Sequence, residues 1–251
     1  MSKTVETWMA IPDTHIPFHN VPALRATEKL MADLQPDGIV YIGDMGDYKV
    51  IKDVWEGNKA YSERHYTSII EDHMAVEEML ERQVAICGSK VKRIFLEGNH
   101  EERIRRFICQ VPMADRSNLL LEEYFQFHKR GIQFYPLNIP AQLGKLYLLH
   151  GVYHGKYHSN QHVVNYHRNI MYGHTHDRQI YTEITPIDVE DVHAGQSIGC
   201  LCDKNPDYMK NRPNRWVHGF SVIYVHKNGS FNDHFVKITR GKFMFGGKVY
   251  G

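Results

Sequence analysis

The stretch YIGDMGDYKV, residues 41–50, places two carboxylates directly after an apolar run. The run Gly38–Ile42 predicts a buried β-strand, because it is short, continuous and rich in β-branched residues. Asp44 and Asp47 then follow three residues apart, with Gly43 before them. A strand that ends in such a polar, glycine-containing turn is typical of a ligand-binding edge in an α/β sheet.

The chain around this stretch alternates between strand and helix patterns. Helical spacing occurs over Pro22–Leu34 and Tyr66–Ile86, and further short apolar strands are predicted at Trp8–Ile11 and Arg93–Leu96. The order β-α-β-α-β predicts parallel strands with helices on the faces of the sheet.

The second half of the chain is predicted to be rich in strands. Two hairpin turns are expected, Gly144–Lys145 and Lys227–Ser230. The predicted strand regions are Gln133–Gly151, Asn169–Tyr172, Ile180–Thr185, Val192–Ser197, Gly219–His226 and Phe231–Ile238.

Size and composition favour an ordinary soluble protein. The 251 residues, 42% hydrophobic and 24% charged, predict a single domain over residues 1–251. No apolar run approaches the ~20 residues of a membrane helix, and Met1–Glu6 does not resemble a secretory signal, so a cytoplasmic protein without a membrane partner is expected. The net charge of +1 gives no global attraction to nucleic acid.

The histidine content points to metal or proton chemistry, whereas the cysteine content does not. Seventeen histidines are many for a residue whose special uses are metal ligation and proton transfer. The four cysteines lack zinc-ribbon spacing and predict reduced thiols. Cys200 and Cys202 could share a ligand, but alternation along a strand explains their spacing more simply.

Polar side chains gather where the predicted strands end. They are Asp13, His15, Asp44, Asp47, Asn99, His100, His150, His174 and His176. Because the carboxyl ends of parallel strands form one crevice, these side chains can meet in space. Carboxylates, an amide oxygen and imidazoles suit Mn, Fe or Zn, and one carboxylate can bridge two such ions about 3.5–4 Å apart.

Five motifs, taken in order, resemble those of the calcineurin-like metallophosphoesterase superfamily, in particular its compact bacterial and phage members. They are Asp13-Thr14-His15, Gly43-Asp44-Met45-Gly46-Asp47, Gly98-Asn99-His100-Glu101, His150-Gly151 and Gly173-His174-Thr175-His176. The resemblance implies a four-layer α/β/β/α sandwich of two mixed β-sheets. It also implies two divalent ions, with Mn expected and Fe, Zn or Ni as alternatives.

The same resemblance implies roles for individual residues. Asp13, His15 and His176 would hold one metal, Asn99, His150 and His174 the other, and Asp44 would bridge them. His100 would protonate the leaving oxygen or steady the phosphoryl group. Asp47 would hydrogen-bond His100 and favour its charged form, although a helix N-cap is an alternative role for Asp47. The implied chemistry is attack on phosphorus by a metal-bound hydroxide.

Further candidates lie outside these motifs. His154 and His158 could contact substrate phosphate, or belong to a solvated loop. Residues 203–216 form a predicted substrate-selecting loop in which Lys204 and Arg212 are candidate phosphate contacts, with Tyr208 and Trp216 as possible stacking partners. Glu101 and Glu102 are interpreted as acids that favour the first turn of a helix.

Differences between this sequence and the protein phosphatases of the superfamily narrow the range of expected substrates. Related protein phosphatases carry Asp-Arg-Gly where this chain has Asp47-Tyr48-Lys49, which counts against a protein phosphatase. A phosphodiester of a nucleotide or nucleic acid is therefore the expected substrate, with a phosphomonoester as the alternative. A non-catalytic binding scaffold, like the retromer subunit with this fold, is an alternative of another class.

Overall fold

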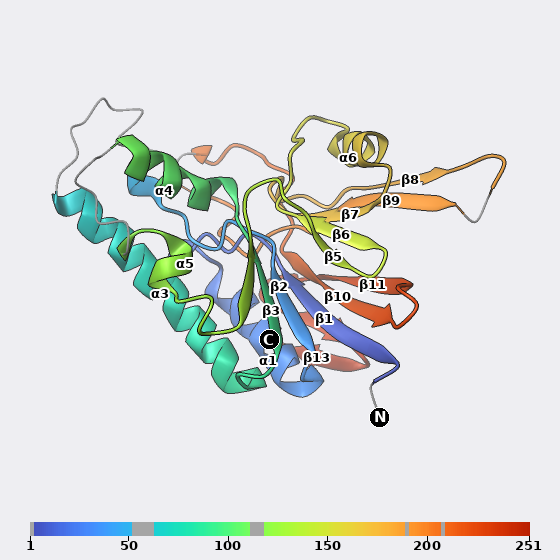
Figure 1. Ribbon diagram of the computed structural model, residues 1–251, viewed down its shortest axis with the longest axis horizontal. Coiled ribbons are helices and arrows are strands. Elements are labelled where there is room, and N and C mark those ends of the chain that lie inside the picture. The colour runs from blue at the N-terminus through green and yellow to red at the C-terminus, as the bar shows by residue number, and fades with distance from the viewer. Residues whose placement is uncertain (1–2, 52–62, 111–117, 189–190, 207–208) are drawn as a thin grey trace.

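The computed structural model describes residues 3–51, 63–110, 118–188, 191–206 and 209–251. Its larger sheet has the order β11-β10-β1-β2-β3-β4, in which β1 to β4 are parallel and β10 and β11 are antiparallel (Figure 1). These strands are β1 (Val5–Ile11), β2 (Gly38–Tyr41), β3 (Lys92–Leu96), β4 (Ile132–Tyr135), β10 (Gly219–His226) and β11 (Phe231–Lys237).

The second sheet has the order β5-β6-β7-β9-β8. Its three central strands are parallel, and both edge strands pair antiparallel with their neighbours. The strands are β5 (Ala141–Leu143), β6 (Leu146–Leu149), β7 (Asn169–Tyr172), β8 (Ile180–Ile184) and β9 (Val192–Ser197). Both sheets are therefore mixed.

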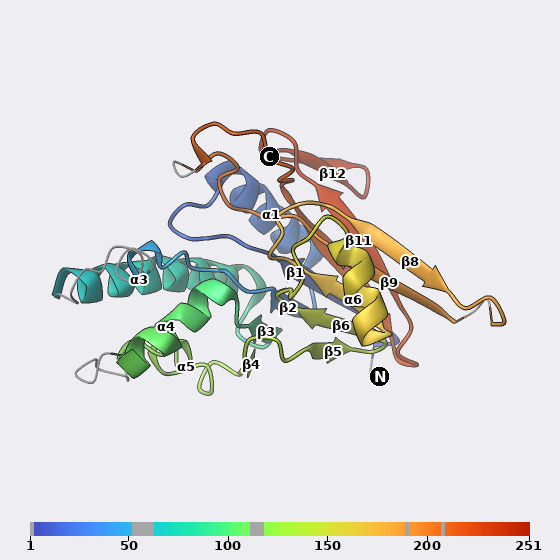
Figure 2. The same ribbon diagram turned by 90° about the horizontal axis from the view of Figure 1, so that it is seen from above.

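Helices cover the outer faces of the two sheets. On the larger sheet lie α1 (Val21–Leu34), α3 (Glu63–Cys87), α4 (Asn99–Gln110) and α5 (Leu121–Tyr124), whereas α6 (His158–Tyr166) contacts β7, β8 and β9 (Figure 2). The layers thus run helix, sheet, sheet, helix. The predicted four-layer α/β/β/α sandwich of two mixed sheets is confirmed.

The three hydrophobic interfaces between these layers follow from alternation along the strands. In β1, Met9 and Ile11 pack against the helices, while Trp8 and Ala10 face the second sheet. A smaller cluster of Leu149, Ile170 and Tyr172 lies on the outer side of the second sheet. Because successive side chains of a strand point to opposite faces, a strand buried on both sides needs a continuous apolar run, as these strands have.

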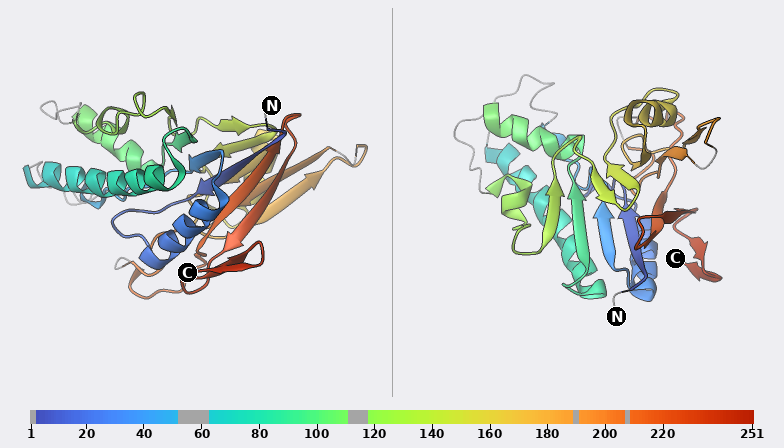
Figure 3. Two further views of the ribbon diagram at one scale, coloured as in Figure 1. Left: turned by 90° about the horizontal axis from the view of Figure 1, so that it is seen from below. Right: turned by 45° about the vertical axis from the view of Figure 1, so that its right-hand side comes forward.

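Most predicted elements appear close to their expected bounds. Helix α1 begins after Asn20, whose side chain accepts a hydrogen bond from the Ala23 N–H, and it ends at Gln35 in a left-handed conformation. The hairpin of β12 (Phe243–Phe245) and β13 (Lys248–Tyr250) was not predicted. It turns at Gly246-Gly247 and lies beside α1 (Figure 3).

Domain organisation and the absence of membrane-spanning helices were also predicted from the sequence. The single domain over residues 1–251 stays a prediction. Among the described helices, none combines the length and apolar character that a bilayer crossing requires.

Buried His162 in α6 predicts acid sensitivity. Its Nδ1 donates to the His158 carbonyl, and its Nε2 accepts from the Val152 N–H, so the bonded imidazole is neutral. Burial lowers the pKa of His162 from its ordinary 6.5 to about 4. Because the unfolded chain then binds more protons, we expect the free energy of unfolding to fall by up to about 1.4 kcal/mol per pH unit as pH drops from 6.5 towards 4.

Urea titrations across this pH range measure the slope. His162→Gln should flatten it, whereas His128→Gln, at an exposed position, should leave it unchanged. An unchanged slope in His162→Gln would assign the acid sensitivity to other groups.

Candidate metal centre

The predicted metal-ligating side chains converge where the two sheets meet. The larger sheet contributes the loops after β1, β2 and β3, and the second sheet contributes those after β6 and β7. In chain order the side chains are Asp13, His15, Asp44, Asn99, His150, His174 and His176. The structure brings all seven together, with both sheets supplying members of the site.

The backbone at these residues is unusual. Asp13, His15, Asp44, His174 and His176 have φ values of 38°, 48°, 51°, 65° and 59°. Left-handed backbone is uncommon for residues other than glycine and gathers at functional sites, where the surrounding fold holds it. The five residues follow the ends of β1, β2 and β7, so left-handed turns occur in three of the loops that build the site.

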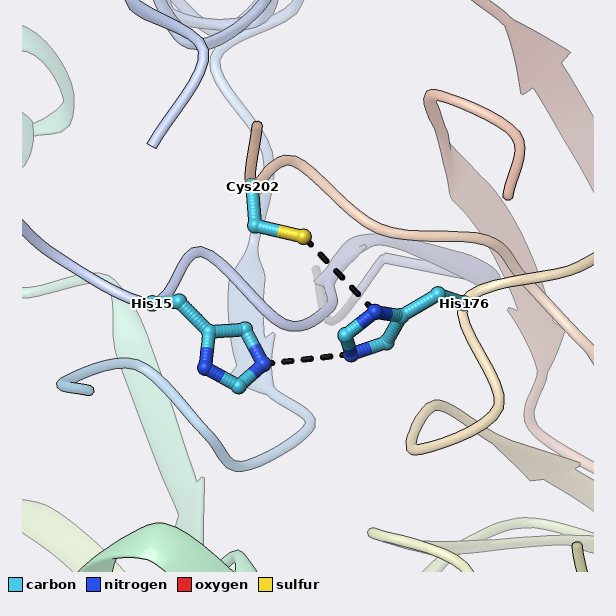
Figure 4. Close-up of side chains that lie close together, drawn as sticks. All are labelled: His15, His176 and Cys202. Carbon is cyan, nitrogen blue, oxygen red and sulfur yellow. Dashed lines mark hydrogen bonds between the residues drawn. The ribbon is translucent and has the colours of Figure 1, made fainter. Parts of the chain in front are cut away.

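Asp13, His15 and His176 form the first group. The Nε2 atoms of His15 and His176 are 3.1 Å apart, and an Asp13 oxygen lies 3.3 Å from the His176 Nε2. Asp13 also accepts hydrogen bonds from the His174 N–H, which fixes its carboxylate. Figure 4 shows the rings of His15 and His176 pointing toward one another.

Asn99, His150 and His174 form the second group. The Asn99 Oδ1 lies 3.0 Å from the His150 Nε2 and 2.9 Å from the His174 Nδ1, and these two nitrogens are 3.2 Å apart. The other nitrogen of His150, Nδ1, bonds the Ile42 carbonyl at 2.9 Å. That bond places the ring proton on Nδ1 and leaves Nε2 free to ligate.

Asp44 lies between the two groups. Its Oδ2 is 3.6 Å from the His15 Nε2 of the first group and 3.3 Å from the His150 Nε2 of the second. Its other oxygen accepts from the His100 N–H at 2.9 Å. Burial opposes ionisation, but His150 and His100 hold the pKa of Asp44 well below its ordinary range. Asp44 is thus an anion positioned to face both groups.

The donor atoms fit a pair of cations. For metal–ligand bonds of about 2.1 Å, adjacent donors are separated by about 3.0 Å in an octahedron and about 3.4 Å in a tetrahedron, which matches the spacings within each group. Buried sets such as Asp13, His15 and Asp44 or Asp44, His150 and His174 could each hold an ion. Burial lowers the basicity of His150, yet the Asp44 charge outweighs it and raises the pKa of His150 to about 10. Surroundings that attract a proton this strongly also attract a metal cation.

His100 lies beside this centre with its Nε2 directed at Asp44, 3.8 Å from the Oδ2. Its Nδ1 bonds the main-chain carbonyl of Asp47 at 2.6 Å, whereas the Asp47 carboxylate bonds the His15 Nδ1 at 3.0 Å. The Asp47 carboxylate also lies 3.4 Å from the His100 Nδ1, so the expected contact is present but longer than the main-chain bond, and the carboxylate is shared with His15.

The surroundings of His100 also differ from the expected ones in charge. Burial lowers the pKa of His100 to about 4, and the Asp44 carboxylate opposes this shift without overcoming it. The surroundings therefore favour the neutral imidazole, rather than the charged form that was expected from Asp47. The Arg103 Nη1, 3.1 Å from the His100 Nδ1, adds positive charge on the same side.

Glu101 has a positional role that its place in the first turn of a helix does not suggest. It is fully buried. Its carboxylate accepts four main-chain hydrogen bonds, from the N–H groups of Asp44, Met45, Gly46 and Gly98. Glu101 therefore ties the turn that carries Asp44 to the turn that precedes Asn99. The only available sequence signal was an acid directly after Asn-His.

Glu101→Gln should weaken metal binding without touching a ligand. An amide offers one acceptor oxygen and sets its NH₂ group against N–H donors, so we expect about 2 kcal/mol lower unfolding free energy and roughly 10–100-fold weaker metal affinity. Glu102→Gln is the matched control, since the described bond of the Glu102 side chain is to Arg106, which is exposed on the helix surface. Calorimetric titration with Mn²⁺ and thermal unfolding measure both effects, and equal results for the two variants would contradict the role of Glu101.

Two glycines allow the close packing around the carboxylates. A Cβ on Gly98 would collide with the Asp44 side chain and main-chain nitrogen, and one on Gly173 would collide with the Asp13 carboxylate. Even alanine at these positions would displace a carboxylate that faces the centre.

The structure separates the two candidate histidines after His150. His154 is exposed and lies edge-on to His174, with ring centroids 6.0 Å apart. His158 is buried, and its two nitrogens bond the Tyr172 hydroxyl and the Asp177 carboxylate. Both nitrogens of His158 are bonded inside the protein, so of these two histidines only His154 has a ring available to contact phosphate.

The predicted loop 203–216 is described except for residues 207–208, so Tyr208 lies outside the described residues. Lys204 and Arg212 are both exposed. The Arg212 Nε donates to the Met209 carbonyl, and the Lys204 carbonyl accepts from Asn214. The loop is thus held by its own hydrogen bonds while its cationic groups face solvent.

Cys202 is a neighbour of the centre that the strand interpretation did not foresee. Its buried Sγ lies 3.7 Å from the His176 Nδ1, on the side of the ring away from His15 (Figure 4). A hydrogen bond with Cys200 and burial raise the pKa of the Cys202 thiol well above its ordinary value. Cys202 also forms, with His15 and His176, a buried set of donor atoms that could hold an ion.

Comparison with known proteins gives a distant set of relatives. No family model matches the chain. The Gene 54 protein of Mycobacterium phage D29 is 26% identical over 267 residues, which covers 100% of this chain and 99% of that protein.

Two solved structures align with most of the chain. The chain is similar to vacuolar protein sorting 29 of Cryptosporidium parvum, with a TM-score of 0.47 and 12% identity over 95% of this chain and 100% of that one. It is also similar to Vps29 of Chaetomium thermophilum, with a TM-score of 0.42 and 10% identity over 94% of this chain and 99% of that one.

The architecture and the site together define the structural class. Two mixed sheets with flanking helices place five motif loops at one edge, and buried His/Asp groups of metal-ligating type lie there. This architecture and this grouping of donor atoms are those that the motif resemblance implied.

Proposed function

We propose that the protein is a phosphoester hydrolase that depends on two divalent metal ions. The observation that carries this proposal is the position of Asp44, a buried carboxylate with one oxygen within 3.6 Å of nitrogens from two separate donor groups. A structural metal site is closed around one ion, whereas two groups that share a carboxylate are typical of hydrolytic two-metal sites.

The donor set indicates how the ions would be held. Asp13, His15 and His176 would hold one and Asn99, His150 and His174 the other, with Asp44 shared. Mixed nitrogen and oxygen donors suit Mn²⁺, which we propose as the preferred ion, with Fe, Zn or Ni as alternatives. When bound, such ions lower the pKa of water and neutralise charge on phosphoryl oxygens.

His100 and its neighbours would act on the substrate. Its Nδ1–H is held by the Asp47 carbonyl, so its Nε2 is presented to the centre. A bound phosphoester brings negative charge that raises the affinity of Nε2 for a proton, which His100 can then give to the leaving oxygen. The Asp47 carboxylate orients His15, and exposed His154 offers a contact to phosphate.

A phosphodiester is the proposed substrate, with a phosphomonoester as the alternative. Tyr48, at the position where related protein phosphatases carry arginine, is fully buried, with its hydroxyl on the His73 Nδ1. This position therefore offers no cation to bind the additional negative charge that a monoester carries relative to a diester. A nucleotide or nucleic acid suits the exposed cations of loop 203–216.

Metal analysis and paired substrates test this function. We expect about two divalent ions per chain, and turnover with Mn²⁺ of bis-p-nitrophenyl phosphate faster than p-nitrophenyl phosphate. Chelation should abolish both activities, and Mn²⁺ should restore them. Faster monoester turnover would reverse the substrate order, and a metal-loaded protein without either activity would refute the hydrolase.

A further inference from the structure

Trp216 stands at the rim of the first donor group. Its ring lies edge-on to His176, with centroids 4.3 Å apart and planes at 72°. The main chain on both sides of the ring is fixed, because the Trp216 N–H donates to the Asn214 side chain and the Val217 N–H donates to the His176 carbonyl at 2.8 Å. The main chain that carries the indole is therefore fixed relative to His176, a predicted ligand.

The indole is only half-buried, although it is the largest apolar side chain of its loop. An indole that served only to pack against His176 would gain more from full burial. Here part of Trp216 remains open to solvent beside His176, whose Nε2 lies 3.1 Å from that of His15. Such a surface is suited to a flat partner that arrives with the substrate.

The described part of the same loop also carries exposed cations. Lys204, Lys210, Arg212 and Arg215 are all exposed. Asn side chains brace the loop, since Asn205 bonds Asn211 and Asn214 bonds the Lys204 carbonyl. An aromatic ring and exposed cations on one braced loop form the combination that binds single nucleotides and single strands by stacking and phosphate contact.

We propose that Trp216 is a stacking platform for a nucleobase attached to the phosphate at the metal centre. This inference rests on the proposed function and specifies its substrate class as nucleotide-containing phosphodiesters. Every base presents a π-face, so the platform selects for a base without selecting its identity. The exposed cations then contact phosphates further along the substrate.

Two substrates with the same leaving group isolate the contribution of the base. They are the p-nitrophenyl ester of thymidine 5′-monophosphate and methyl p-nitrophenyl phosphate. Stacking is worth about 1–3 kcal/mol per base, so Trp216→Ala should lower kcat/KM for the thymidine ester roughly 5–150-fold, mainly through KM. The methyl ester should change by less than about twofold, and Trp216→Phe should retain most of the wild-type preference.

Tyr181→Ala is the matched control, because Tyr181 is an exposed aromatic on the edge strand β8. It should leave both substrates unchanged. Equal losses on both substrates in Trp216→Ala, or a loss of bound Mn²⁺, would assign Trp216 a purely structural role and overturn the proposal.

Binding of a product gives a readout that does not require turnover. Calorimetric titration of the Mn²⁺-loaded protein with thymidine 5′-monophosphate should show weaker binding in Trp216→Ala, while binding of inorganic phosphate should not change. If the wild-type protein hydrolyses the methyl ester as efficiently as the thymidine ester, the stacking platform is refuted but the proposed function is not. Wild type that turns over neither ester refutes the proposed function.

Discussion

Asp44→Asn is expected to remove metal binding and activity together. The amide keeps the size of the side chain but loses the charge that faces nitrogens of both donor groups. Without this anion the two ions repel each other across the site, and at least one should be lost. We expect kcat/KM for bis-p-nitrophenyl phosphate to fall at least roughly 10³-fold, or about 4 kcal/mol, with fewer metal ions per chain by elemental analysis.

A charge-matched control separates this effect from a general loss of a carboxylate. Asp33 lies on the exposed side of α1, where it pairs with Lys248. Asp33→Asn should therefore keep full metal content and activity. A binding scaffold would behave differently, because Asp44→Asn would then leave its function intact even after the metal was lost. Full activity of metal-depleted Asp44→Asn would refute the two-metal hydrolase.

His100→Asn is expected to separate catalysis from metal binding. The His100 Nε2 is 3.8 Å from Asp44, while its Nδ1 bonds a main-chain carbonyl, so His100 is not required for either donor group. We expect activity to fall by roughly 10²–10⁴, the range for losing a general acid, with metal content close to that of wild type. Rates with bis-p-nitrophenyl phosphate and elemental analysis of the same samples measure the two quantities.

Two further variants define what this result means. His174→Asn should lose metal, because the His174 Nδ1 faces the Asn99 oxygen and the His150 nitrogen. His128→Asn, at an exposed position, should change neither metal content nor activity. A collapse of metal occupancy in His100→Asn, equal to that of His174→Asn, would place His100 among the ligands.

The central strands were accessible from sequence because the core alternates, whereas the four layers were implied by the motif resemblance. Trp8 and Ala10 face one interface while Met9 and Ile11 face the other, so a doubly buried strand appears as an unbroken apolar run. The same runs end in the polar loops that build the site. The C-terminal hairpin escaped prediction because its strands have only three residues each, too few to show a strand periodicity.

The site was predictable in its composition but not in its internal hydrogen bonds. Residue type and position relative to strand ends brought seven side chains to one place. Which atom of Asp47 bonds His100, and that Glu101 clamps two turns, depend on left-handed turns and on contacts between loops distant in sequence. The contact of Cys202 with His176 likewise requires the segment after β9 to cross the end of β7.

The division of the donor groups between the two sheets has a mechanical consequence. Asp13 and His15 extend from one sheet and His176 from the other, and Asn99 faces His150 and His174 across the same boundary. Each ion, once bound, would cross-link the two sheets, because its ligands come from both. The free energy of unfolding would then depend on the concentration of free metal ion. A ligand that binds only the folded chain stabilises it in proportion to the logarithm of its concentration over its dissociation constant.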